Sequence, residues 1–72
     1  MKKFISVVTA CFNEEGNVEE LYARVKAAFT CLADYRYEHI FIDNASRDQT
    51  VAKLKALALQ DPNVKIIVNT RN

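Results

Sequence analysis

The residues best suited to chemistry form two short polar clusters, and each follows a run of β-branched and aromatic residues. The first cluster runs from Phe12 to Glu15, and the second from Asp43 to Arg47. A planar ring such as that of Phe12 can stack on a nucleobase, a contact worth about 1 to 3 kcal/mol in proteins that bind single-stranded nucleic acid. A carboxylate such as Asp43 can accept a hydrogen bond from a ribose hydroxyl or a base N–H. The two clusters therefore suit the binding of a nucleoside.

Each of these residues also has a purely structural interpretation. Phe12 could fill the hydrophobic core, and Asp43 could accept hydrogen bonds from its own loop. Arg47 and Arg71 are the basic side chains that could neutralise a diphosphate, although a solvent-exposed arginine is the simpler interpretation of Arg47. Glycine-rich phosphate loops are excluded, because Gly16 is the only glycine of the chain.

Three β-rich runs, with two helical patterns between them, must position these clusters. Strands are predicted over residues 3–9, 37–43 and 64–68, and the first, which lacks Gly and Pro, is predicted to be covered on both faces. Parallel strands joined by right-handed helical crossovers give an α/β fold, a partial doubly wound, Rossmann-like sheet of strand order 3-2-1. The polar clusters then lie at the carboxyl ends of neighbouring strands, where such sheets bind ligands.

The two helices are predicted from capping patterns and apolar periodicity. Asn17 and Ser46 are each followed three residues later by Glu or Gln, the spacing of a capping box, so a helix should begin at each. Apolar residues at spacings of three and four follow both. The second helix should end near residue 60, because proline at Pro62 disfavours helix in the residue before it.

Charge and composition exclude several classes of function. Ten basic residues against nine acidic ones leave no electrostatic footprint for nucleic acid. No apolar run approaches the roughly 20 residues of a membrane-spanning helix, so a cytoplasmic chain is expected. Cys11 and Cys31 lack metal-ligand spacing, and we expect them to be reduced thiols in partly buried positions. His39 is expected to be an ordinary structural histidine.

The two clusters also match the opening motifs of a known family. SVVTACFNEEGNVEEL resembles the start of family two glycosyltransferases, which usually carry Pro-x-Tyr-Asn-Glu-Glu after the first strand. IDNASRDQT resembles their second motif, usually Val-Asp-Asp-Gly-Ser-x-Asp-x-Thr, at the family's spacing. NEEGNVEEL and the closing NTRN are most similar to the branch that includes dolichol-phosphate mannose synthases and bactoprenol glucosyltransferases. Together these motifs cover nearly the whole chain.

The resemblance implies a GT-A fold and assigns roles to particular residues. It makes residues 1–72 the N-terminal nucleotide-binding part of a glycosyltransferase domain whose downstream half is absent, with the catalytic residues outside this chain. Phe12, Glu14 and Asp43 would hold the base and ribose. The full set of nucleotide-binding residues that we predict is Ala10, Phe12, Glu14, Asp43, Asn44 and Arg71.

Three positions depart from the family pattern. Ala10 stands where the family has proline, Asn44 where it has a second acid, and Ala45 where it has a turn glycine. Asn44 keeps hydrogen-bonding capacity through its amide, but the loss of a carboxylate could alter nucleotide preference or weaken binding. Because only glycine adopts positive φ freely, we predict a negative φ at Ala45.

The same resemblance implies the chemistry of a longer parent protein. It would be an inverting hexosyltransferase that displaces a nucleoside diphosphate from a nucleotide diphosphate sugar, UDP- or GDP-linked. The acceptor would be a polyprenyl phosphate, with the parent at the cytoplasmic face of a membrane. A divalent cation, Mg²⁺ or Mn²⁺, would be held by a downstream Asp-x-Asp and not by residues 1–72, which alone should be inactive.

Two other classes of function stay open. In a small non-catalytic α/β interaction module, Glu14 and Asp43 would merely solvate the ends of loops. A receiver-type domain would phosphorylate Asp43, but it requires an Asp after the third strand, in the region where Asn69 stands. For the glycosyltransferase interpretation, the unpaired edge of the first strand predicts a homo-oligomer, in which such edges or exposed apolar faces meet.

Overall fold

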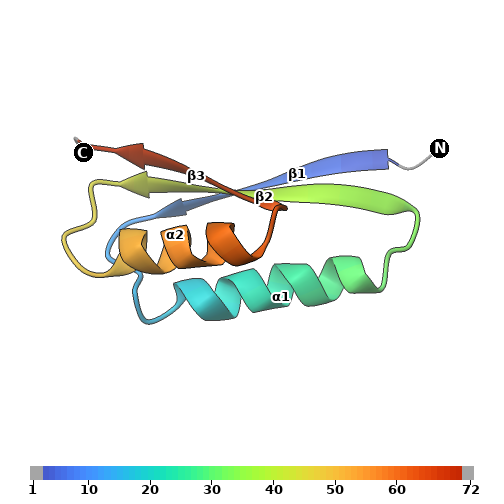
Figure 1. The fold of residues 1–72 in the computed structure, drawn as a ribbon, viewed down its shortest axis with the longest axis horizontal. Coiled ribbons are helices and arrows are strands. Elements are labelled where there is room, and N and C mark those ends of the chain that lie inside the picture. Colours follow the sequence, from blue (N-terminus) through green and yellow to red (C-terminus); the bar gives the residue numbers. More distant parts are fainter. Residues whose placement is uncertain (1–2, 71–72) are drawn as a thin grey trace.

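The computed structural model describes residues 3–70, which form a single parallel sheet with two helices. The elements in chain order are β1 (Lys3–Cys11), α1 (Val18–Thr30), β2 (Tyr35–Asn44), α2 (Thr50–Gln60) and β3 (Val64–Asn69). The sheet has the order β1-β2-β3, with β2 in the centre and parallel pairing on both sides. Figure 1 shows all three strands pointing toward the same end of the molecule. The predicted α/β class, the β-α-β-α-β order and the sheet order 3-2-1 are confirmed.

Each strand is longer than the apolar run that predicted it. β1 continues to Cys11, β2 begins at Tyr35 and continues to Asn44, and β3 continues to Asn69. The extra pairs at the carboxyl ends include Cys11 with Asp43 and Asn44 with Asn69. Backbone ladders do not require apolar side chains, so pairing continues into the polar motifs. Asp43 is therefore fixed inside a strand.

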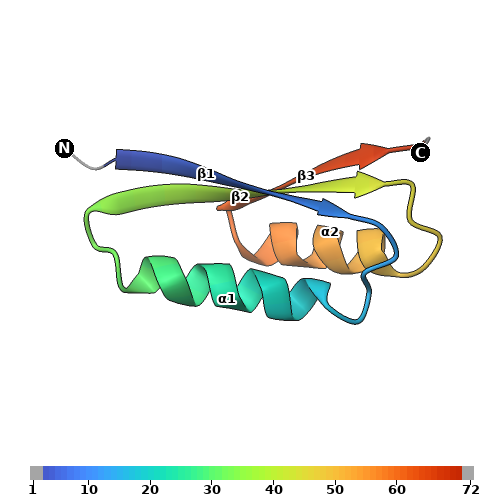
Figure 2. The ribbon, with the colours of Figure 1, turned by 180° about the vertical axis from the view of Figure 1, so that it is seen from behind.

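Both helices lie on one face of the sheet, as the two opposite views in Figures 1 and 2 show. Each crossover steps to the next strand in the same direction, so right-handed connections place both helices on the same side. On the opposite face Phe4 is 62 % exposed and Val8 is 58 % exposed. The prediction that the first strand is covered on both faces is therefore wrong for the described residues. A run of β-branched residues indicates that a strand is buried, but it does not show whether one or both faces of the strand are covered.

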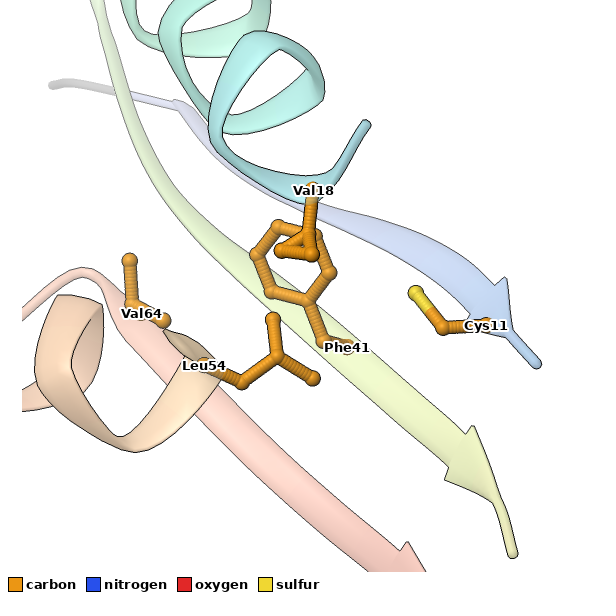
Figure 3. Close-up of a cluster of buried hydrophobic side chains, with 5 residues drawn as sticks. All are labelled: Cys11, Val18, Phe41, Leu54 and Val64. Atoms are coloured by element: carbon orange, nitrogen blue, oxygen red, sulfur yellow. The ribbon is translucent and has the colours of Figure 1, made fainter. Parts of the chain in front are cut away.

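The core between helices and sheet is small and draws on every element. Its five buried apolar side chains, drawn in Figure 3, are Cys11, Val18, Phe41, Leu54 and Val64. Phe41 from the central strand lies between residues of the two helices. Cys11 is buried and Cys31 is exposed, and both are free thiols. Burial, together with the nearby carboxylates of Asp43 and Glu14, raises the pKa of the Cys11 thiol, which keeps it protonated and unreactive.

At neither helix start does the side chain of the N-cap residue cap the backbone, although capping boxes were predicted at both. α1 begins at Val18 after Asn17, as predicted, but the Asn17 side chain donates to Glu14 Oε2 at 3.0 Å and caps no backbone N–H. α2 begins at Thr50, four positions after Ser46, so the predicted start of the second helix is wrong. It ends at Gln60 before proline, as predicted. The Ser46 side chain donates a hydrogen bond to Asp43 in β2 instead of capping the helix.

Candidate functional site

A hollow of about 610 Å³ opens at the carboxyl ends of the strands. It is lined by Phe12, Asn13, Asp43, Ala45, Ser46, Arg47, Val51, Val68, Asn69 and Thr70. These residues come from the loop after β1, the end of β2 with its following loop, the start of α2 and the end of β3. The two polar clusters singled out in the sequence therefore meet at one rim, and Phe12 and Asp43 line the same hollow.

Phe12 is one of the more exposed aromatic side chains. The residue is 46 % exposed although it follows directly on the buried Cys11. The interpretation of Phe12 as a core-filling ring is therefore wrong. Val51 and Val68 line the same hollow, so the ring belongs to a partly apolar wall that a flat heterocycle could contact.

Asp43 stands in the wall of the hollow without any exposed surface, at 0 % exposure. Its carboxylate accepts the Ser46 backbone N–H at 3.0 Å and also the Ser46 hydroxyl. Acceptance of hydrogen bonds from its own loop, the plainer of the two interpretations, is thus observed. A direct hydrogen bond from Asp43 to a nucleoside stays a prediction.

Asn13 connects the first loop to the second beside the hollow. Its backbone N–H donates to Ser46 Oγ at 2.8 Å, and its side-chain Oδ1 accepts the backbone N–H of Arg47 at 2.8 Å. The Ser46 hydroxyl thus accepts from Asn13 while it donates to Asp43. A continuous hydrogen-bonded path runs from the loop that carries Phe12 to the buried carboxylate.

Further hydrogen bonds join the same two segments away from the hollow. The backbone N–H of Glu14 donates to Thr50 Oγ1 at 2.8 Å, and that of Glu15 donates to Asp48 Oδ2 at 3.3 Å. Lys53 Nζ donates to the Glu15 carbonyl at 2.8 Å. Burial raises the pKa of Asp48, but hydrogen bonds from Thr50 and Glu15 outweigh it and the net pKa is lowered. The carboxylate therefore stays ionised and available as an acceptor.

Two residues of this region adopt left-handed backbone conformations. Asn13 has φ 50° and Ala45 has φ 59°. Asn tolerates this conformation, whereas alanine is strained by about 1 to 2 kcal/mol. The predicted negative φ at Ala45 is wrong, because the chain must reverse within three residues for Ser46 to return to Asp43. The turn keeps the geometry that the family's glycine would favour.

The remaining predicted site residues lie elsewhere. Ala10 and Glu14 line a separate hollow of about 310 Å³ with residues of α1. Asn44 Oδ1 accepts a hydrogen bond from Asn69 Nδ2 at 3.1 Å. Arg71 lies outside the described residues. The structure therefore brings Phe12 and Asp43 together and separates them from Ala10 and Glu14.

The loop-joining roles of Asn13, Ser46, Asp48 and Thr50 were missed from the sequence. Their signal was present as an excess of short hydrogen-bonding side chains in the first cluster and in residues 43–50, which include the second. Such side chains also cap helices, and the capping interpretation relied on near neighbours alone. Arg47 is exposed, as the simpler interpretation predicted, and it also lines the hollow.

His39 is buried among the side chains between the sheet and the helices. Its Nε2 is 2.9 Å from Thr9 Oγ1 and its ring stacks on Phe41. This agrees with the predicted structural role. Among residues 3–70, no group of three or more His, Cys, Asp or Glu side chains could hold a metal ion. Within the same residues, neither helix has the length and apolar character to cross a membrane.

Comparison with known proteins adds an independent observation. Residues 6–72 match the family model described as Glycosyl transferase family 2. The chain is 40 % identical over 68 residues to a prophage bactoprenol glucosyl transferase homolog of Escherichia coli, covering 94 % of this chain and 22 % of that protein. It is 38 % identical over 69 residues to an undecaprenyl-phosphate 4-deoxy-4-formamido-L-arabinose transferase of Pseudomonas fluorescens, covering 94 % and 20 %.

A third relative is an uncharacterized glycosyltransferase of Bacillus subtilis, 36 % identical over 67 residues, with 93 % of this chain and 20 % of the relative covered. The chain thus spans about a fifth of the length of the curated relatives it matches. The match over 6–72 takes in both polar clusters, most of β1 and all the later elements of the fold.

Proposed function

This chain belongs to glycosyl transferase family 2, and from that premise we propose that its larger hollow binds the nucleoside of a nucleotide diphosphate sugar. The parent protein would transfer the sugar to an acceptor with inversion at the anomeric carbon. UDP- and GDP-sugars are the donor candidates. Residues 1–72 supply binding and no catalytic group, so the chain alone should not turn over.

The observation that carries this proposal is the meeting of Phe12 with the polar second loop at one hollow. An exposed ring stacks on a base with little sequence preference, because every base presents a π-face. Arg47 and Thr70 line the same hollow and can donate hydrogen bonds to oxygen atoms of a ribose or phosphate. The hollow therefore offers both an apolar face and polar donors, as small-ligand sites do.

Calorimetric titration with UDP and GDP tests the proposal. A base-dependent signal is expected for the unmodified chain, and Phe12→Ala should weaken it by about tenfold, since loss of one stacking contact removes about 1 to 3 kcal/mol. Because the residue is 46 % exposed, the same change should leave the fold intact. The proposal would be contradicted if the unmodified chain and the Phe12→Ala variant gave equal heats of nucleotide binding, or if neither gave any.

The competing function is a non-catalytic interaction module, favoured by the open sheet face with Phe4 and Val8. It predicts no nucleotide signal at all, so the same titration separates the two. A receiver-type role for Asp43 has no support, because the carboxylate is buried and bonded to Ser46. A phosphoacceptor must be reachable by the phosphodonor.

The acceptor that we propose for the parent is a polyprenyl phosphate, at the cytoplasmic face of a membrane. Its support is the names of two relatives, a bactoprenol glucosyl transferase homolog and an undecaprenyl-phosphate transferase. A divalent cation, Mg²⁺ or Mn²⁺, is proposed for the parent by family membership. Residues 3–70 do not provide a fitting donor set for it. The roles of Ala10, Glu14, Asn44 and Arg71 in nucleotide binding also stay predictions.

Self-association of this chain is a further prediction. Within residues 3–70 the outer edge of β1 pairs with no strand, and Lys3 is its only charged side chain. An edge strand with little charge tends to pair with another chain. Sedimentation at micromolar concentration should detect a dimer or larger assembly, and a single monomeric species would contradict this.

A further inference from the structure

We propose that Asp43 acts on the nucleoside indirectly, as a positioning residue that orients Phe12 through Ser46 and Asn13. This inference rests on the proposed nucleotide-binding function and concerns the same hollow. It differs from a direct contact between Asp43 and the ligand, and the difference can be measured. The path consists of two hydrogen bonds in series: the Ser46 hydroxyl donates to Asp43, and the Asn13 backbone N–H donates to that hydroxyl.

The first step is the state of the Asp43 carboxylate. It is fully buried and accepts both the backbone N–H and the hydroxyl of Ser46. A carboxylate with no exposed surface offers no contact to a ligand in the hollow as the two loops stand. Two acceptor bonds to one residue, closed by the left-handed turn at Ala45 with φ 59°, hold that residue firmly in place.

The second step is the double use of the Ser46 hydroxyl. Its proton points to Asp43, which leaves its lone pairs for the Asn13 backbone N–H at 2.8 Å. Only a side-chain hydroxyl can donate and accept at one atom in this way. The carboxylate thus fixes the orientation of the hydroxyl, and the hydroxyl fixes the backbone of Asn13.

The third step is the fixed backbone at Asn13. Its N–H is held by Ser46, its Oδ1 by the Arg47 N–H at 2.8 Å, and its φ is 50°. Phe12 precedes this clamped residue directly. Cys11, on the other side of Phe12, is paired within the sheet, so the chain is held on both sides of Phe12 and with it the direction of its Cα–Cβ bond.

A double-mutant cycle on nucleotide affinity tests the inference. Asp43→Asn and Ser46→Ala should each weaken UDP or GDP binding by about tenfold, the equivalent of one lost charge-assisted hydrogen bond. The double variant should bind the nucleotide as tightly as whichever single variant has the lower affinity, because both changes cut the same path. Ser46→Thr keeps a hydroxyl and should restore binding to within about twofold. If the affinity of the double variant instead falls by the product of the two single losses, the two residues act independently. That result would overturn the inference in favour of a direct Asp43 contact.

A matched control separates positioning from general loss of stability. Lys53→Met removes a hydrogen bond between α2 and the same first loop, to the Glu15 carbonyl, without touching either hollow. Urea unfolding of each variant reports its stability. The affinity loss of Ser46→Ala should exceed that of Lys53→Met, and equal losses would overturn the inference. If Ser46→Ala does not fold, Asp43→Asn takes its place in this comparison, because it cuts the same path at its other end with little change of side-chain shape.

A ligand-free measurement distinguishes failure of this inference from failure of the proposed function. The Phe12 ring shifts the NMR signals of nearby methyl groups, and Val51 and Val68 line the same hollow. Ser46→Ala should move these methyl signals and Ser46→Thr should return them. If the unmodified chain binds no nucleotide but the signals move, positioning of Phe12 stands and the nucleotide function falls. If the signals do not move, the positioning role is refuted.

Discussion

The helix-covered core and the polar loops at the carboxyl ends of the strands both join distant parts of the sequence, but by different forces. The core has one buried apolar side chain from each of the five elements. The loops are joined by directional hydrogen bonds that involve Asn13, Ser46 and Thr50. Apolar burial depends on area and volume and is not directional, whereas each hydrogen bond requires one particular donor and one acceptor.

This difference assigns different tasks to the two regions. Cores accept replacements that keep volume and apolar character, at a cost usually below about 1.5 kcal/mol. In a loop network the loss of one donor or acceptor costs free energy even when the shape of the side chain is kept, because its partner is left unsatisfied. We therefore expect the core to determine how stable the chain is, and the loops to determine where Phe12 points.

The largest expected effect comes from truncating the same residue type in the two regions. Phe41 is fully buried at 0 % exposure, and Phe12 is 46 % exposed. Phe41→Ala should lower the free energy of unfolding by about 3 to 5 kcal/mol, from lost burial and the cavity left behind. Phe12→Ala should lower it much less. Urea unfolding followed by circular dichroism measures both, and similar losses would show that the distinction between core and rim is wrong.

The next largest effect is a loss of folding stability on acidification, caused by the buried histidine His39. His39 is 1 % exposed, and burial lowers its pKa from the ordinary value of 6.5. In the unfolded chain the ring takes up a proton near pH 6.5, while in the folded chain it does so only at lower pH. Its contribution to stability is thus fully present above about pH 6.5 and is lost as the pH falls from there toward the folded pKa.

Unfolding free energies measured at intervals between about pH 7.5 and pH 5 check this expectation, since most carboxylates titrate lower. His39→Gln removes the titrating ring and should flatten the profile over that range. A profile of the same slope in both chains would show that His39 is not its cause. Ser46 carries no titrating group, so Ser46→Ala should shift the curve without changing its shape.

The same division explains which features could be predicted from the sequence. Apolar periodicity placed the two helices and three strands in the right order, because the core is built by repeating local patterns. The second helix start failed at Ser46, whose hydroxyl bonds to Asp43 and Asn13 rather than to its own helix. A capping pattern describes only near neighbours, and here a partner 33 residues away is preferred.

The candidate site was predictable in location but not in detail. Strand-end loops of a parallel sheet meet by topology, so the meeting of Phe12 and Asp43 followed from the strand order. Exposure of Phe12 and burial of Asp43 did not, because they depend on how the two loops contact each other. The strained φ at Ala45 was hidden for the same reason: the bond from Ser46 to Asp43 requires it.

The smallest expected effect is on the strain in the second loop. Ala45→Gly should relieve about 1 to 2 kcal/mol of left-handed strain, against about 0.5 to 1 kcal/mol of added backbone freedom in the unfolded chain. A net gain of about 0.5 to 1 kcal/mol in unfolding free energy is expected, visible as a higher urea midpoint at unchanged slope. Nucleotide affinity should stay equal or improve, because the turn that returns Ser46 to Asp43 is kept. If glycine instead destabilises the chain, alanine is not strained here, and the loop is held by its hydrogen bonds without conformational cost.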